Sequence, residues 1–187
     1  MKIYTKAGDA GETYLASGTK VTKTDPRVAL YGTCDELNSV IGFAISFSSV
    51  NEETFTNFLS HTQNLLFEIG SELAGYIPKD RESTCLFASD ITDIENEIDR
   101  LTESLSPLRS FILPRGSSFA AGLHMARTVC RRLERDVLVY VESGGAISME
   151  IRTYLNRLSD YFFTAARYAN FLVSHKESEW KSRTKKQ

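Results

Sequence analysis

The sequence predicts an all-α fold, a bundle of five helices preceded by an extended N-terminal arm. Apolar residues recur at steps of three and four through five segments of the chain, which is the period of helices with one buried side. Proline and glycine gather between those segments, while the first 24 residues show no helical period. We therefore expect a single domain over residues 1–175, made of an arm (1–24) and a helical bundle (25–175).

The arm carries a glycine-containing loop, TKAGDAGET, over residues 5–13, called the arm loop below. Gly8 and Gly11 permit a tight backbone and the close approach of a ligand. The loop's hydroxyls and the Lys6 ammonium could donate to phosphate oxygens together with backbone N–H groups. A Walker A motif is absent. The arm loop therefore predicts either a phosphate cradle or a plain turn, and Lys23 adds positive charge beyond it.

The first three helices are expected over about 25–49, over about 51–75, and from a capping box at Thr92-Asp-Ile-Glu95 onwards. Asp25 followed by proline is a strong start signal for the first of them. Asp35 interrupts the apolar stripe of that helix. It is either a surface acid or the partner of an arginine elsewhere in the bundle.

A connector over residues 106–116, SPLRSFILPRG, separates the third and fourth helices. Its apolar run, Phe111 to Leu113, lies between two prolines. Such a run is either a buried plug or a wall against an apolar ligand. Both uses require apolar side chains, so the sequence leaves the choice open.

The fourth helix concentrates positive charge over residues 124–137, HMARTVCRRLERDV. When it is wound as a helix, Arg127, Arg131 and Arg135 stack along one side, called the arginine face below. Arginines this close require an anionic partner, and the adjacent Glu134 supplies only one charge. The face therefore predicts carboxylates from another helix or a phosphate-bearing ligand, with a plain solvated face as the alternative.

The fifth helix, expected over about 148–174, is apolar almost all round, as a central helix should be. Asn156, Asp160 and Arg167 nevertheless share one face of it with Phe163. We expect Asn156 to be buried, where it either fixes helix register or binds a polar ligand. The charged tail that follows, residues 176–187, is expected to fray.

Composition excludes several classes of function. The net charge of −2 gives no basic field for nucleic acid. Three dispersed cysteines and three dispersed histidines predict neither a disulfide framework nor a metal site built from protein side chains. The N-terminus shows no apolar leader and the chain has no 18-residue apolar run, which predicts a cytoplasmic protein with no membrane contact.

Six separated motifs occur in order: KIYTKAGDAGET, VTKTDPRV, YGTCDELNSVIGFA, FILPRG, HMARTVCRRLER and NRLSDYFFTAARYAN. Over roughly residues 2–173 the chain resembles the PduO-type ATP:cob(I)alamin adenosyltransferases. The resemblance implies a ferritin-like five-helix bundle and a homotrimer with active sites between subunits. It implies transfer of the 5′-deoxyadenosyl group of ATP to the Co(I) of cobalamin or another corrinoid, giving adenosylcobalamin and triphosphate. Mg²⁺ is expected with ATP, and an electron-donor reductase is a further possible partner.

The resemblance also implies roles for individual residues. The residues implied to bind ATP are Thr5, Lys6, Ala7, Gly8, Asp9, Gly11, Thr13, Lys23, Arg131, Arg132, Glu134, Arg135 and Asn156. Asp35 would pair with Arg127 across subunits, and Phe111 would close the lower face of the corrin ring. These three residues and Arg131 are the implied catalytic set.

Two positions depart from the family pattern. Arg115-Gly116 stands where the family commonly has two glycines after the LP of the FILPRG motif. Lys20 stands where the family often has arginine, which keeps the charge and loses bidentate geometry. Both departures concern segments next to implied ligand sites.

Two rival functions remain at this stage. The chain could be a non-catalytic helical binding or assembly module that uses the arginine helix for intersubunit salt bridges, but such a module has no need of the arm loop. It could also be a nucleotide hydrolase. A hydrolase needs a residue that activates water near the γ-phosphate, and the sequence indicates none.

Overall fold

The computed structural model describes residues 3–4, 6, 8–49, 52–81 and 83–184. The elements within these residues are β1 (Glu12–Tyr14), β2 (Lys20–Thr22), α1 (Pro26–Ser46), α2 (Glu53–Leu73), α3 (Ala88–Glu103), α4 (Ser118–Glu142) and α5 (Met149–Leu172). The predicted five-helix bundle with an extended arm is confirmed. None of the helices described here is long and apolar enough to cross a bilayer.

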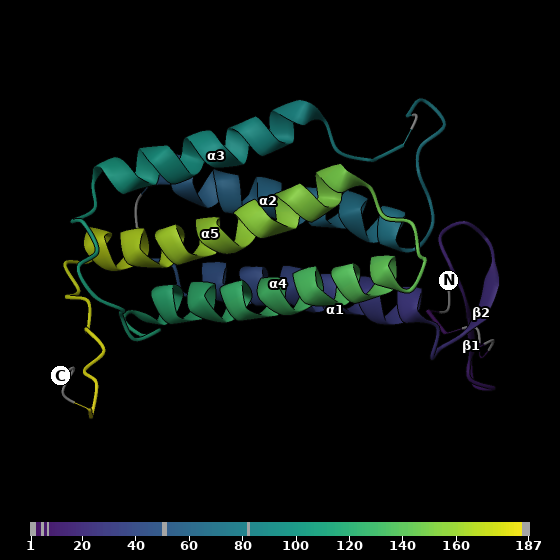
Figure 1. Ribbon diagram of the computed structural model, residues 1–187, viewed down its shortest axis with the longest axis horizontal. Coiled ribbons are helices and arrows are strands. Elements are labelled where there is room, and N and C mark those ends of the chain that lie inside the picture. The colour runs from purple at the N-terminus through teal and green to yellow at the C-terminus, as the bar shows by residue number, and fades with distance from the viewer. Residues whose placement is uncertain (1–2, 5, 7, 50–51, 82, 185–187) are drawn as a thin grey trace.

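The five helices lie side by side along one long direction (Figure 1). α4 packs against both α1 and α5, while α2 packs on α1 and α3 packs on α5. The β1–β2 hairpin lies beyond the end of the bundle at which α1 begins, and the described part of the tail after α5 lies at the opposite end. The helix with the arginine face is therefore an inner member of the bundle, and the arm and the tail mark its two ends.

Side-chain caps determine where three helices begin. Asp25 Oδ1 accepts a hydrogen bond from the backbone N–H of Arg27 at 2.8 Å, and proline occupies the first helical position as predicted. Ser117 caps α4 and Ser148 caps α5 through their hydroxyl oxygens. These caps satisfy backbone donors that the helices themselves leave free.

The predicted start of α3 at Thr92 is wrong. The helix begins at Ala88, because the Asp90 carboxylate accepts the backbone N–H of Phe87 at 2.7 Å and closes the first turn there. The Thr92 hydroxyl donates instead to the Ala88 carbonyl, one turn back inside the helix.

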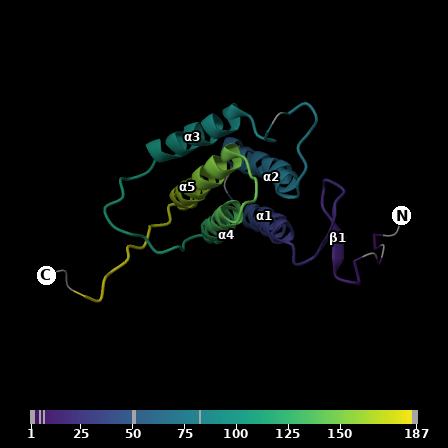
Figure 2. The same cartoon turned by 45° about the vertical axis from the view of Figure 1, so that its right-hand side comes forward.

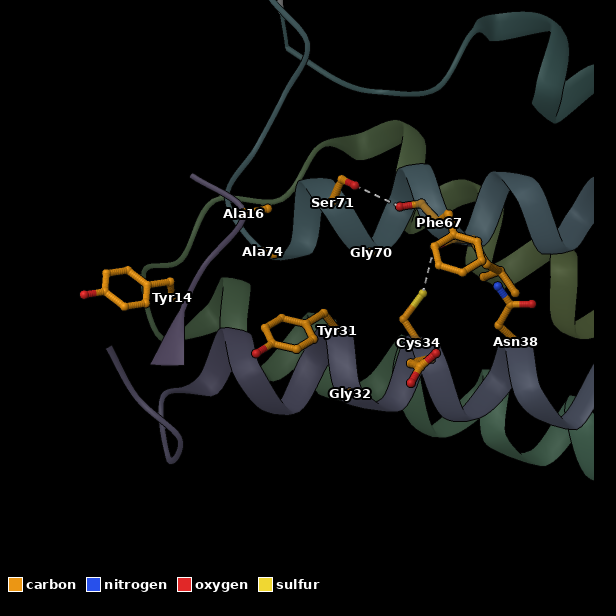
Figure 3. A pocket seen from close by; sticks show the side chains of 12 residues that line it. Tyr14, Ala16, Tyr31, Gly32, Cys34, Asn38, Phe67, Gly70, Ser71 and Ala74 are labelled. Atoms are coloured by element: carbon orange, nitrogen blue, oxygen red, sulfur yellow. Dashed lines mark hydrogen bonds between the residues drawn. The ribbon is translucent and has the colours of Figure 1, made fainter. Parts of the chain in front are cut away.

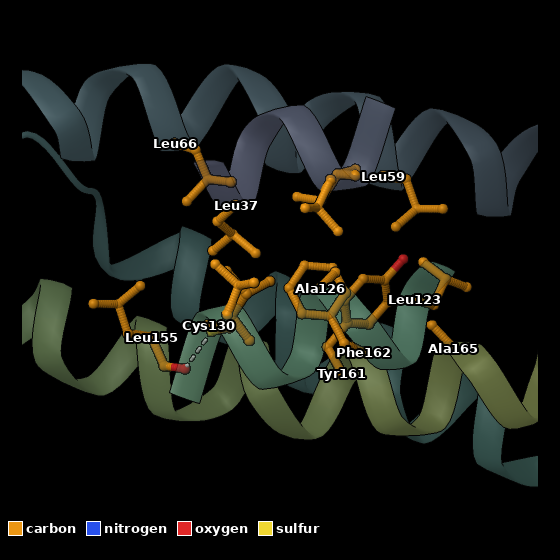
Figure 4. Packing of buried hydrophobic residues seen from close by; sticks show 14 of the residues in the cluster. Leu37, Leu59, Leu66, Leu123, Ala126, Cys130, Leu155, Tyr161, Phe162 and Ala165 are labelled. Carbon is orange, nitrogen blue, oxygen red and sulfur yellow. Dashed lines mark hydrogen bonds between the residues drawn. The ribbon is translucent and has the colours of Figure 1, made fainter. Parts of the chain in front are cut away.

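The core is formed by large apolar side chains from all five helices, and Figure 4 shows part of it. Those drawn there include Leu37, Leu59, Leu66, Leu123, Leu155, Tyr161 and Phe162. The Cys130 thiol of α4 donates to the Leu155 carbonyl of α5 at 3.3 Å. A Cβ on Gly122 would come within 2.7 Å of Ala44 Cβ, so α1 and α4 approach closely at that point. Core packing thus fixes the direction in which the arginine face points.

The start of the tail contacts the connector, which differs from the expectation that the tail frays. The backbone N–H of Leu113 donates to the Ser178 carbonyl at 2.8 Å, and that of Trp180 donates to the Phe111 carbonyl at 2.7 Å. Ile112 and Glu179 form an antiparallel bridge between these bonds. Backbone pairing with the connector therefore orders residues 177–180, called the tail segment below.

Candidate functional site

The arm loop presents a lysine ammonium against a glycine backbone. A Cβ on Gly8 would lie 3.1 Å from Lys23 Nζ, so the ammonium occupies space that a side chain would crowd. The Lys23 N–H donates to the Gly11 carbonyl at 2.8 Å, which fixes the lysine beside the loop. Gly11 has a φ of +82°, a conformation that favours glycine. The loop can therefore bring backbone N–H groups and a cation to one ligand.

The other predicted arm residues lie around this point. Lys6 and Asp9 are exposed, and the Asp9 N–H donates to the Lys6 carbonyl. Thr13 belongs to β1 and pairs with Val21 of β2. Two predicted positions, Thr5 and Ala7, lie outside the residues that the structure describes.

Lys20, which departs from the family pattern, pairs with a carboxylate on the hairpin. Its Nζ lies 2.5 Å from Glu12 Oε2 across the two strands, and both side chains are exposed. This ion pair partly neutralises the lysine charge. It makes Lys23, whose ammonium lies over Gly8, the better-placed arm cation for an anionic ligand.

The arginine face has cations available for a ligand. Arg131 and Arg135 are exposed, and neither forms a hydrogen bond or an ion pair with any described residue. Glu134 beside them accepts a hydrogen bond from Asn156 Nδ2 at 2.8 Å. The structure therefore places Glu134 and Asn156, two of the residues that the resemblance implied for ATP, in contact beside Arg131 and Arg135.

Asn156 is exposed, so the expectation that it is buried is wrong. Asn156 and Arg167 share one face of α5, which is exposed to solvent at Asn156 and buried at Arg167. Asn156 Oδ1 accepts from Arg157, whose Nε contacts Glu95 at 2.7 Å. The amide is thus held from both sides while it remains accessible to a ligand.

Arg132 lies apart from the arginine face. Its guanidinium forms an ion pair with Glu36 of α1. Arg132 is one residue after Arg131, a rotation of about 100° around the helix, which turns it toward α1. Of the three arginines implied at the nucleotide, the structure leaves Arg131 and Arg135 unpaired and gives Arg132 a partner within the chain.

Asp35 and Arg127 do not meet within one chain. Asp35 is exposed at a cavity between α1 and α2, whereas Arg127 follows His124, whose ring lies beside Phe163 of α5. Arg127 Nε is buried without a hydrogen-bond partner, and Asp35 has none among the described residues. Burial and the nearby Arg131 charge lower the pKa of Arg127. A half-buried guanidinium of this kind calls for a carboxylate from outside the chain.

The cavity at Asp35 has a volume of about 410 Å³ and lies between the hairpin, α1 and α2 (Figure 3). Tyr14, Tyr31 and Phe67 line it, together with the small residues Gly70 and Ala74. Sequence reasoning missed these aromatics. Phe67 was the signal available in the sequence, because it interrupts the polar side of α2. In the structure its side chain is 70% exposed.

Phe111 is 80% exposed, so the interpretation of this residue as a buried plug is wrong. Its ring contacts the Trp180 ring of the tail segment edge-on, with 6.4 Å between centroids. A second cavity, of about 550 Å³, is lined by residues of the connector, the end of α5 and the tail segment. Phe111 is therefore available to an apolar ligand at this end of the bundle.

His124 makes the folded chain sensitive to acid. It is 3% exposed, and neither ring nitrogen has a hydrogen-bond partner. Burial, helped by the Arg127 charge and opposed by Glu177, lowers the pKa of His124 from 6.5 to about 4. Between these values the unfolded chain binds a proton that the folded chain does not, so stability is lost as pH falls through this window.

We expect the free energy of unfolding to decrease by about 2 kcal/mol from this group between pH 7.5 and pH 5.0. Denaturant titrations at the two pH values measure the change. His124→Gln should flatten the slope, whereas His61→Gln, at an exposed site, should leave it as it is. Equal slopes in all three proteins would contradict the assignment.

The arm loop and the arginine face do not contact each other within one chain. No hydrogen bond or ion pair joins residues 8–24 of the arm to α4. The hairpin lies beside α1 and α2 at one end of the bundle, and α1 lies between β1 and α4 in the view of Figure 2. Two half-sites for an anionic ligand are thus present on one chain and are held apart.

Comparisons with known proteins agree with these features. The family model for cobalamin adenosyltransferases matches residues 3–169. The corrinoid adenosyltransferase of Bacillus subtilis is 44% identical over 172 residues, covering 91% of this chain and 87% of that protein. Human corrinoid adenosyltransferase MMAB is 41% identical over 180 residues, covering 94% of this chain and 72% of the human protein.

Solved structures give the same result. A variant PduO-type ATP:corrinoid adenosyltransferase from Lactobacillus reuteri, complexed with cobalamin and ATP, superposes with a TM-score of 0.88 at 38% identity. The match covers 97% of this chain and 100% of the other. A second variant of that enzyme, complexed with ATP, has a TM-score of 0.85 at 39% identity, covering 96% and 100% of the two chains.

Proposed function

Because the chain belongs to the cobalamin adenosyltransferase family, it transfers the adenosyl group of ATP to a corrinoid, and we propose that the arm loop and the arginine face hold the ATP. One observation carries this assignment. Arg131 and Arg135 are exposed and unpaired beside the Glu134–Asn156 hydrogen bond, which is where a polyphosphate would find charge-assisted donors.

The reaction places specific demands on these residues. Co(I) donates an electron pair to C5′ of ATP, the Co–C bond forms as the C5′–O bond breaks, and triphosphate leaves with that bond's electrons. The nucleophile carries no proton, so the step needs no general base. The chain must instead align C5′ with cobalt and stabilise charge on the leaving group, which Lys23, Arg131 and Arg135 are suited to do.

Mg²⁺ is proposed to enter with ATP. Within the described residues, no group of three or more His, Cys, Asp or Glu side chains could hold a metal ion. Mg²⁺ is commonly held by substrate phosphates and water, and bound there it would neutralise part of the triphosphate charge. The arginine face and Lys23 would then neutralise the remainder.

We propose a homotrimer in which each ATP site combines the arm of one subunit with the arginine face of the next. The separation of the two half-sites within one chain supports this arrangement. So does the half-buried Arg127, whose Nε lacks a partner, because the exposed Asp35 of another copy could pair with it. The assembly-module alternative shares this pairing but leaves the arm loop without a role.

If Asp35 and Arg127 pair between subunits, Asp35→Asn and Arg127→Ala should each lower activity. Each removes one partner of the pair and leaves the other charge uncompensated. The double variant should lose less than the two single losses combined. Activity and sedimentation of all four proteins measure this coupling. Strictly additive losses, or a wild-type protein that sediments as a fully active monomer, would count against the pair.

We propose that the Phe111 ring closes the lower face of the corrin. An apolar ring there would exclude water or the dimethylbenzimidazole ligand from Co(II), and losing that axial ligand makes reduction to Co(I) easier. The exposure of Phe111 and the adjacent cavity support this role. A reductase is the proposed electron donor. The three cysteines are buried free thiols, in keeping with a reducing compartment, which we propose to be the cytoplasm.

An anaerobic assay with chemically reduced cobalamin and MgATP tests the function. We expect Co(I) absorbance to be lost only when ATP is present, with adenosylcobalamin and triphosphate formed in equal amounts. Omission of ATP is the control. Release of ADP and phosphate without loss of Co(I) would reject the transferase and favour a hydrolase.

A further inference from the structure

The connector that carries Phe111 is held at both ends by two side chains of α5. Arg167 Nη2 donates to the Ser106 carbonyl at 2.7 Å, where the connector begins. Asn170, one turn later on α5, holds the other end. Its Oδ1 accepts the Ser117 N–H at 3.0 Å, and its Nδ2 donates to the Arg115 carbonyl at 3.2 Å.

Both side chains are buried, so their contacts are shielded from water. Arg167 is 7% exposed and Asn170 is 2% exposed. Gly116 allows the close approach of Asn170, because a Cβ on Gly116 would collide with the Asn170 amide. Its φ of +148° is also one that other residues rarely adopt. The end of the connector is therefore shaped to receive the asparagine.

The tail segment completes this arrangement from the outside. Arg167 Nε forms an ion pair with Glu177 Oε1 at 2.7 Å, so one guanidinium holds both the connector and the tail segment. The Trp180 N–H donates to the carbonyl of Phe111 itself at 2.7 Å. The Arg115 guanidinium donates to Ser178 Oγ. The residue of the FILPRG motif that differs from the family pattern is therefore bonded to the tail segment.

Phe111 has little packing of its own to hold it. Its surface is 80% exposed, and the ring contact that it makes is the edge-on one with Trp180 of the tail segment. The direction of its ring must therefore be set by the connector backbone. That backbone is in turn fixed by Arg167 at its start, Asn170 at its end and the tail segment along its middle.

We propose that Arg167 and Asn170 are positioning residues for the reaction, which hold the connector so that Phe111 lies against the lower face of the corrin. This inference rests on the proposed function, in which Phe111 removes the lower ligand of Co(II). Neither Arg167 nor Asn170 is among the residues proposed to hold ATP. They act through Phe111, and Glu177 assists by holding Arg167.

The test compares two activities of the same variant. One assay starts from Co(II) cobalamin with reduced flavin as electron donor, and the other starts from Co(I) supplied by Ti(III) citrate. In Arg167→Met and Asn170→Ala we expect the Co(II)-started rate to fall about ten- to a hundredfold relative to the Co(I)-started rate, because misplacing a positioned group costs that much. Arg167→Lys keeps the charge facing Glu177 and should recover part of the ratio.

Electron paramagnetic resonance gives a readout that does not depend on turnover. Nitrogen splitting of the Co(II) signal reports whether dimethylbenzimidazole is still bound. With MgATP present, we expect wild-type protein to abolish this splitting, and Arg167→Met and Asn170→Ala to retain it. A merely structural role would lower the melting temperature and would leave the splitting as in wild type.

Arg27→Met is the matched control. Arg27 is partly buried and, like Arg167, donates to backbone carbonyls, those of Glu72, Leu73 and Ala146, but at the opposite end of the bundle. It should lower the melting temperature and leave the ratio unchanged. The inference is overturned if Arg167→Met and Asn170→Ala keep the wild-type ratio, or if Arg27→Met changes it equally. Failure of wild-type protein to consume Co(I) with ATP would instead reject the proposed function.

Discussion

Replacing Arg131 with alanine is expected to weaken ATP binding or turnover by about one to two decades. Arg131 is exposed between Arg127 and Arg135 and has no partner among the described residues, so a phosphate contact is the interaction at stake. A hydrogen bond to a charged group contributes roughly 1.5–3 kcal/mol, which gives this range. Initial rates across an ATP titration measure the loss.

Arg183→Ala controls for the change in net charge. Arg183 lies exposed near the end of the tail and forms no ion pair with the described residues, so its removal should leave the ATP titration unchanged. The melting temperature of Arg131→Ala should stay close to wild type, because the side chain is exposed and forms no hydrogen bond or ion pair with the described residues. Normal kinetics in Arg131→Ala would show that this arginine is only a solvated surface charge.

Phe111→Ala is expected to lower the Co(II)-started rate much more than the Co(I)-started rate. Without the ring, water or dimethylbenzimidazole regains access to the lower face, so the Co(II)-started rate should fall by about one to two decades. The Co(I)-started rate should fall less, because Co(I) holds no axial ligand. A buried phenylalanine would cost about 3–5 kcal/mol of stability on truncation, but the exposure of Phe111 predicts a nearly unchanged melting temperature.

Phe87→Ala is the matched control for loss of an exposed ring. Phe87 is 57% exposed and lies under the Arg81 guanidinium, before α3, away from the connector. It should leave the ratio of the two rates at its wild-type value. A wild-type ratio in Phe111→Ala, together with a large drop in melting temperature, would reject the role at the corrin.

Much of the fold follows from local sequence signals. Apolar spacing gives the five helices, and Asp25 and Ser148 give two of their starts. The start of α3 was missed because two acceptors compete there. Asp90 accepts the free backbone N–H of Phe87, and the Thr92 hydroxyl donates to the Ala88 carbonyl instead of capping the helix. Which acceptor caps the helix depends on the fold of the preceding loop, and the capping-box motif alone does not show that fold.

The site was predictable in part. Helical geometry placed Arg131 and Arg135 on one side, and their exposure agrees with that pattern. Contacts between distant segments were not predictable from spacing. Three contacts join residues far apart in sequence. They are the ion pair of Arg132 with Glu36, the close approach of Asn170 to Gly116, and the pairing of the tail segment with the connector. Each depends on the packing of whole helices.

The most direct test of the central claim, that one ATP site is assembled from two copies of the chain, is complementation between inactive variants. One variant carries Lys6→Ala with Lys23→Ala in the arm, and the other carries Arg131→Ala in α4. Each should be severely impaired alone. When the two are co-expressed and mix at random, about a quarter of the interfaces combine an intact arm with an intact arginine face. Adenosylcobalamin formation should therefore recover to about a quarter of the wild-type rate. A mixed preparation no more active than the average of its two variants would contradict a site shared between subunits.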